Sequence, residues 1–151
     1  MTPDALRPEV IAERVAWIRE RLADLRRLPL GSYSEFEADA RNPAAAESHL
    51  RRALEALLDL GRHILAKRFA RATTEYKEIA VALIEVGVLD SHHGERLKDM
   101  AGYRNRLVHF YHDVTRRELY QICTTELADV DAVLGARLDW IRKDGAREAA
   151  S

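Results

Sequence analysis

Apolar residues recur at intervals of three and four along most of the chain, and this spacing predicts amphipathic helices. The clearest case is the segment 8–28, whose isoleucine, valine and leucine residues fall on one stripe with coiled-coil-like spacing. We find no stretch with the strict alternation of apolar and polar residues that marks a half-buried strand. We therefore predict an all-α fold, an up-and-down bundle of four main helices with a short extra helix. The main helices are expected over residues 8–28, 42–69, 75–86 and 115–141, and the short one over residues 91–101.

Glycine, proline and asparagine indicate where several of these helices begin, end or touch. Asn42 followed by Pro43 is a favourable helix start, with the asparagine as the cap. Residues 29–42 before it are predicted to form a polar connector. Gly87 is a typical C-terminal stop, and Gly61, which lies on an apolar stripe, predicts the close approach of another helix.

Two further positions concern the segment between the short helix and the last one. Gly102 is expected to interrupt the short helix or to let another backbone approach closely. Thr115 and Glu118 have the spacing of a capping box, which predicts the start of the last helix and a turn over residues 112–114.

Length, composition and charge limit the class of protein. The 151 residues suit a single domain, 1–151, with a core from about residue 8 to residue 141 and a frayed tail over 144–151. The formal net charge of −1 excludes a polycation, so any affinity for nucleic acid must come from a local patch. The single cysteine, Cys123, excludes an internal disulfide. With no signal-peptide pattern and no apolar run long enough for a membrane, we expect a cytoplasmic protein without membrane association.

Residues 103–113 read Tyr-Arg-Asn-Arg-Leu-Val-His-Phe-Tyr-His-Asp and concentrate groups that act on phosphate. The guanidinium of Arg104 is a permanent cationic fork for phosphate, and the imidazole of His109 exchanges protons near neutral pH. Attack of an RNA 2′-hydroxyl on the adjacent phosphate needs a proton acceptor, a proton donor and positive charge. We predict Arg104 and His109 as catalytic residues, with Asn105 in support. This chemistry requires no metal and no cofactor, and the His and Cys spacing predicts no zinc site.

A straight helix does not direct these two groups at one point. Each residue turns a helix by about 100°, so Arg104 and His109, five residues apart, point about 140° away from each other. Two arrangements remain open. The helix ends within the motif, as the capping box at Thr115 favours, or a second copy of the chain completes the site across a twofold axis.

The motif also resembles that of a known family. HepT-like HEPN proteins, the toxin halves of bacterial and archaeal toxin–antitoxin pairs, carry an Arg-polar-x-x-x-His-x-Tyr motif, and residues 104–111 match it in full. The similarity extends to the runs 51–64, 82–89 and 96–103 and covers about residues 8–141. It implies a helical homodimer with the two motifs facing one cleft, and a metal-independent ribonuclease that cleaves cellular RNA.

The resemblance implies a partner as well, a small MntA-like nucleotidyltransferase antitoxin that transfers AMP from ATP to the motif tyrosine, here Tyr111. The AMP would add bulk and negative charge beside His109 and so repel an RNA phosphate. The chain departs from the family pattern at Arg62, where an asparagine or similar polar residue is expected before His63, and at His112, where many relatives carry an aromatic residue.

Several residues have both a functional and a structural interpretation. The remaining candidates for contacting RNA or lining the cleft are Arg106, His112, Arg116, Asp59 and His63. Asp59 and His63, four residues apart on one helical face, equally suit a solvated pair. Arg104 and His109 equally suit a structural pair at a helix turn. The alternative function is accordingly a non-catalytic helical dimer that binds a nucleotidyltransferase partner, or binds RNA without cleaving it.

Overall fold

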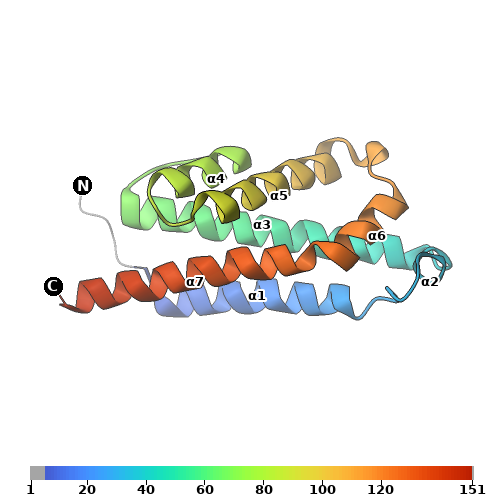
Figure 1. Ribbon diagram of the computed structural model, residues 1–151, viewed down its shortest axis with the longest axis horizontal. Coiled ribbons are helices and arrows are strands. Elements are labelled where there is room, and N and C mark those ends of the chain that lie inside the picture. The colour runs from blue at the N-terminus through green and yellow to red at the C-terminus, as the bar shows by residue number, and fades with distance from the viewer. Residues whose placement is uncertain (1–5, 151) are drawn as a thin grey trace.

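The computed structural model describes residues 6–150, and the regular elements within this range are helical, which confirms the predicted all-α class (Figure 1). Seven α-helices and one 3₁₀ turn follow one another along this part of the chain. They are α1 (Pro8–Arg26), α2 (Tyr33–Glu37), α3 (Arg41–Phe69), α4 (Tyr76–Glu85), α5 (Ser91–His109), η1 (Tyr111–Asp113), α6 (Arg116–Thr125) and α7 (Leu127–Ala150). In residues 6–150 no helix combines the length and the apolar character needed to cross a membrane.

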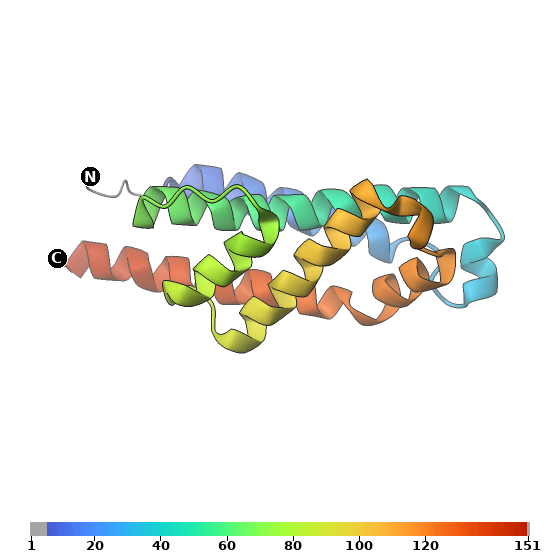
Figure 2. The same cartoon turned by 90° about the horizontal axis from the view of Figure 1, so that it is seen from above.

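Helix α3, 29 residues long, is the central support of the bundle. It contacts α1, α2, α4, α5 and α6. Helices α1 and α7 run along one side of it, and α4 and α5 cover the opposite side (Figure 1). Seen from above, α5 crosses the bundle diagonally towards the end where α2 and α6 lie (Figure 2). This crossing places the sequence motif, which lies in the last turns of α5, against the polar edge of α3.

The core is built on the apolar stripe of α3, where Leu57, Leu58 and Leu65 are fully buried. Burial of each such side chain contributes about 1.5–3 kcal/mol to folding. Gly61 lies on the same stripe, and a Cβ atom at this position would be 2.9 Å from the nearest side-chain carbon of Leu83 in α4. The close approach predicted at Gly61 is therefore confirmed, because a larger residue would force α4 away from α3.

A charged side chain, Arg137 of α7, is also completely buried in this core. Its Nη1 donates a hydrogen bond to the carbonyl oxygen of Leu57 in α3. Burial lowers the pKa of the Arg137 guanidinium to about 9, so the group is still protonated near neutral pH. A charge-assisted hydrogen bond thus joins α7 to the middle of α3.

The predicted connector over residues 29–42 contains a helix, and the capping role predicted for Asn42 is wrong. Helix α2 forms in this segment because Phe36 is fully buried and anchors it to the core. Helix α3 begins at Arg41, one residue before Asn42. The side-chain amide of Asn42 instead donates to the carbonyl oxygen of Phe36 at 3.2 Å and ties α2 to α3.

The helix predicted over residues 91–101 is longer than expected, because Gly102 does not interrupt it. Helix α5 continues through Gly102 to His109. A glycine within a helix costs only about 1 kcal/mol, and a Cβ atom at Gly102 would lie 3.4 Å from the side chain of Lys77 in α4. The extensive packing of α5 on α4 outweighs the small helical propensity of one glycine. The stop predicted at Gly87 is confirmed by its φ of +81°.

The last predicted helix is divided into α6 and α7 at Glu126. The hydroxyls of Thr124 and Thr125 donate to backbone carbonyl oxygens one turn earlier, at 2.9 and 2.6 Å. Such bonds compete with the helical backbone bonds and favour a bend or an end. The apolar period alone did not predict this break, because buried residues continue on both sides of it.

The fraying predicted over residues 144–151 stays a prediction, and residues 144–150 are helical in the described part of the chain. Helix α7 continues to Ala150. The carboxylate of Asp144 is largely buried and lies 2.9 Å from Nε of Arg68 in α3. This ion pair attaches the C-terminal part of α7 to the end of α3.

Candidate active site at the end of helix α5

A surface groove opens where the end of α5 meets α3 and the start of α4. Its volume is ≈ 490 Å³, which is within the range of about 300–1,000 Å³ typical of small-molecule sites. The groove is lined by Arg104, Asn105 and His109, the three residues predicted to carry the chemistry. The other lining residues are Arg62, Thr74, Glu75, Tyr76 and Phe110. The fold thus brings the predicted catalytic residues to one groove of a single chain.

The end of α5 lies inside the motif. His109 is its last residue, and Phe110 leaves the helical conformation with φ −131° and ψ 40°. The short 3₁₀ turn η1 follows, and α6 then begins after Thr115, whose hydroxyl accepts from the backbone N–H of Glu118 at 3.1 Å. This is the start that the capping box predicts. The arrangement in which the helix ends within the motif is therefore confirmed, and completion of the site by a second copy, which can hold at the same time, stays a prediction.

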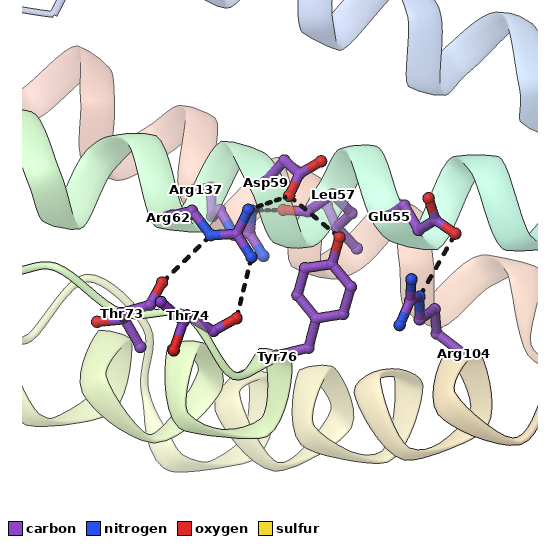
Figure 3. Close-up of polar contacts among 9 residues, drawn as sticks. All are labelled: Glu55, Leu57, Asp59, Arg62, Thr73, Thr74, Tyr76, Arg104 and Arg137. Atoms are coloured by element: carbon purple, nitrogen blue, oxygen red, sulfur yellow. Dashed lines mark hydrogen bonds and ion pairs between the residues drawn. The ribbon is translucent and has the colours of Figure 1, made fainter. Parts of the chain in front are cut away.

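Arg104 contacts Glu55 of α3 and Tyr76 of α4, both drawn in Figure 3, and its neighbour Asn105 in α5. Its Nε lies 3.4 Å from Oε1 of Glu55 in α3, and its Nη1 donates to Oδ1 of Asn105 at 3.3 Å. The guanidinium carbon lies 4.6 Å from the ring centroid of Tyr76, a cation–π contact. The Arg104 side chain is 19% exposed. Within residues 6–150 its Nη2 makes no hydrogen bond, which leaves donors available for a bound anion.

Tyr76 is fixed in turn by two residues of α3 (Figure 3). Its hydroxyl donates to Oδ1 of Asp59 at 3.2 Å, and Arg62 donates to the same carboxylate oxygen at 3.1 Å. Arg62 also donates to the carbonyl oxygens of Thr73 and Thr74 at 3.2 and 3.1 Å. Burial, followed by the negative charge of Asp59, raises the pKa of Tyr76. The Tyr76 hydroxyl therefore stays protonated and serves as a hydrogen-bond donor.

Charges around the groove are nearly balanced. The carboxylates of Glu55 and Asp59 face the guanidiniums of Arg104 and Arg62. Glu55 also accepts from Arg51 at 2.9 Å, so two arginines share its carboxylate. An anionic ligand therefore competes with Glu55 for Arg104, and the groove has no large excess of positive charge. In residues 6–150 no group of three His, Cys, Asp or Glu side chains is placed to hold a metal ion.

The residues from the end of α5 through η1 are exposed. The side chain of His109 is exposed and, within residues 6–150, makes no hydrogen bond. Phe110 is 59% exposed and Tyr111 is 55% exposed. The ring of Tyr111 packs on that of His112 with centroids 4.0 Å apart. His109 and the motif tyrosine, Tyr111, are thus both open to solvent.

The other sequence candidates lie outside the groove lining. Arg106 points to α6, where its Nη atoms donate to Glu118 at 2.5 and 3.0 Å. The Glu118 carboxylate is therefore engaged by Arg106 rather than by the backbone at Thr115. Arg116 is exposed in the first turn of α6. His63 lies on another part of α3, where burial and the nearby positive charges of α1 and α3 lower its pKa.

Sequence reasoning missed Glu55 and Tyr76 and interpreted Arg62 only as a departure from the family. Glu55, Asp59 and Arg62 occupy positions i, i+4 and i+7 of α3, which form one polar stripe on a helix that is otherwise largely apolar. This spacing was a usable signal that α3 presents a polar face. The partner residues could not be read from it, because Arg104 is 49 positions from Glu55.

Fold and groove together define a helical protein with an Arg-polar-x-x-x-His motif at a helix end. A family model described as ribonuclease HepT-like matches residues 18–136. The chain belongs to this HepT-like family, as its motif had indicated. A comparison with curated proteins finds no match.

Solved structures of toxin–antitoxin proteins have the same fold. A toxin–antitoxin structure with AMP-PNP superposes with a TM-score of 0.78 at 19% identity, covering 87% of this chain and 99% of that chain. A tri-AMPylated HEPN toxin of Shewanella oneidensis, in complex with MNT antitoxin, gives a TM-score of 0.77 at 20% identity, covering 86% and 97%. YutE of Bacillus subtilis, a cytosolic protein of unknown function, gives 0.73 at 19% identity, covering 90% and 91%.

The contacts of Arg62 predict a measurable contribution to stability. Arg62→Ala leaves the Asp59 carboxylate and two backbone carbonyl oxygens without this donor. We expect the free energy of unfolding to fall by about 1–3 kcal/mol. Urea denaturation followed by circular dichroism measures this loss, and hydrogen exchange over residues 71–78 is expected to rise.

Arg71→Ala is the matched control for this experiment. Arg71 lies in the α3–α4 connection that Arg62 contacts, and its side chain is as exposed as that of Arg62 but makes a single exposed ion pair, with Glu85 at 2.7 Å. The expected loss for this exposed pair is at most about 1 kcal/mol. Equal losses in the two variants would show that Arg62 does not hold the groove wall.

Proposed function

We propose that this protein is an endoribonuclease toxin that cleaves RNA by metal-independent chemistry in the groove at the end of α5. The observation that carries the proposal is that Arg104, Asn105 and His109 line one groove of one chain. Membership of the HepT-like family supports the same activity. The homodimer implied by the family resemblance is part of the proposal.

In the proposed reaction the 2′-hydroxyl of a ribose attacks the adjacent phosphorus. A bond forms between the 2′-oxygen and phosphorus, and the bond from phosphorus to the 5′-oxygen of the next nucleotide breaks. The products are a 2′,3′-cyclic phosphate and a free 5′-hydroxyl. His109 accepts the proton of the 2′-hydroxyl or donates one to the leaving oxygen. Arg104 stabilises the negative charge that develops on the phosphate oxygens.

The structure offers a reason for the efficiency of Arg104 in this role. Glu55 and Tyr76 restrain the guanidinium before any ligand arrives. A group that is already oriented loses little conformational entropy in the transition state. Asn105 accepts from Arg104 rather than from His109, so its proposed support acts on the arginine.

We further propose that a nucleotidyltransferase antitoxin silences the enzyme by adenylylating Tyr111. The Tyr111 hydroxyl oxygen attacks the α-phosphorus of ATP and forms a bond with it. The bond between the α-phosphorus and the oxygen that bridges to the β-phosphate breaks, and pyrophosphate leaves. The phenolic proton passes to solvent. The exposure of Tyr111 supports access by such an enzyme. The tri-AMPylated HEPN toxin among the solved structures supports the modification. The added phosphate charge beside His109 would repel RNA.

The catalytic assignment predicts the effect of removing His109. His109→Ala is expected to lower kcat/KM for RNA cleavage by about 10²–10⁴-fold, and Arg104→Ala to lower it by about 10²–10³-fold. Both measurements use purified protein, total RNA or tRNA, and EDTA throughout. His92→Ala, an exposed histidine at the other end of α5, is the control and should retain full activity. Cleavage by His109→Ala protein at the wild-type rate would refute the assignment, and RNA binding without turnover in the wild type would favour the non-catalytic alternative.

The silencing proposal predicts a change in mass. Co-expression with an MntA-like partner and ATP should add one or more AMP units of roughly 329 Da each, located at Tyr111 by peptide mass spectrometry. Tyr111→Phe should abolish the addition. Tyr103→Phe, which removes a buried hydroxyl of α5, should leave it unchanged. An active complex in which Tyr111 stays unmodified would indicate inhibition by steric blocking instead.

A further inference from the structure

Phe110 is a free aromatic ring at the edge of the groove. It is 59% exposed and belongs to the groove lining. Within residues 6–150 its ring stacks on no other aromatic ring and no guanidinium. The neighbouring rings are occupied, since Tyr76 is contacted by the guanidiniums of Arg62 and Arg104 and Tyr111 packs on His112. Apart from His109, the proposed acid–base group, Phe110 is therefore the described lining residue whose aromatic face is available to a ligand.

The backbone explains why this ring projects outwards. Phe110 leaves the helical conformation directly after His109, and its N–H still donates to the carbonyl oxygen of Arg106 at 2.9 Å. The backbone is thereby fixed while the side chain lies outside the apolar core, to which it does not belong. A single exposed apolar residue needs no special explanation. Here the exposed ring follows directly after His109, the proposed acid–base group, and lines the same groove, which distinguishes it from an isolated surface residue.

The position suits the base of a bound nucleotide. A phosphate contacting Arg104 and His109 carries nucleosides on either side, each joined to it through one ribose. Phe110 follows His109 directly and lines the same groove, which brings its ring within reach of a nucleotide whose phosphate contacts His109. Single-stranded RNA presents unstacked bases that pack on aromatic side chains. We infer that Phe110 is the stacking platform for a nucleobase next to the scissile phosphate.

This inference rests on the proposed function and extends it to a base-binding subsite. Every base has a π-face, so stacking tolerates any base identity. Phe110 therefore supplies affinity without selecting a sequence. Its removal should raise KM and leave kcat nearly unchanged, because the ring does not contact the reacting atoms.

The test combines a protein variant with a modified substrate. A labelled RNA oligonucleotide with one mapped cleavage site is compared with versions in which the ribonucleotide on either side of the cut is abasic but keeps its 2′-hydroxyl. We expect Phe110→Ala to raise KM for the intact RNA by about 5- to 150-fold. The abasic substitution at the stacked position should have the same effect on the wild-type enzyme and little further effect on Phe110→Ala. Phe110→Trp should restore the wild-type KM.

Val81→Ala is the matched control, because Val81 is an exposed apolar residue of α4 outside the groove lining and its truncation should leave KM unchanged. Independent, additive effects of the Phe110 and abasic changes would overturn the inference. Loss of self-association in Phe110→Ala, measured by sedimentation at assay concentration, would overturn it in favour of contact with a second copy.

If wild-type protein cleaves no RNA, the proposed function fails. In that case the Kd values of the wild type and of Phe110→Ala protein for intact and for abasic RNA are measured by fluorescence anisotropy. Coupling between the two changes supports the base-stacking role, and additivity overturns it.

Discussion

The polar stripe formed by Glu55, Asp59 and Arg62 on α3 is the constraint on which the groove depends. Their side chains contact Arg104 of α5, Tyr76 of α4 and the carbonyl oxygens of the α3–α4 connection. The helix that contributes more buried apolar residues to the described core than any other therefore also orients the proposed active site. Because the two faces belong to one rigid helix, packing on the core side fixes the geometry on the polar side.

Two opposing requirements meet at Arg104. A phosphate ligand needs a free cationic fork, whereas a flexible arginine would lose entropy on binding. The structure satisfies both, because Nε and Nη1 are engaged within the protein while Nη2 is available. On a straight helix His109 would point away from Arg104. Because α5 ends at His109, one groove is lined by both side chains. Near-neutral charge around the groove makes affinity depend on specific contacts rather than on bulk attraction.

The sequence predicted the helical class, most helix positions and three of the polar groove residues, because these depend on local period and on one contiguous motif. It failed where packing outweighs propensity, as at Gly102, and where threonine hydroxyls divide an apolar run before Glu126. Asn42 is a residue type that favours a helix cap, but in the fold its side-chain amide donates to the carbonyl oxygen of Phe36 instead. The contact of Arg104 with Glu55 depends on the angle at which α5 crosses α3, which no local pattern specifies.

The most direct test asks whether Arg104 and His109 act from the same chain. Arg104→Ala and His109→Ala proteins are mixed under conditions that exchange subunits, and the wild type is likewise mixed with the double variant. With both groups in one groove of one chain, we predict that the two single variants stay inactive together. Wild-type chains should keep their cleavage activity beside the double variant. Recovery of RNA cleavage by the mixed single variants would contradict this, because it requires the arginine of one chain to serve the histidine of another.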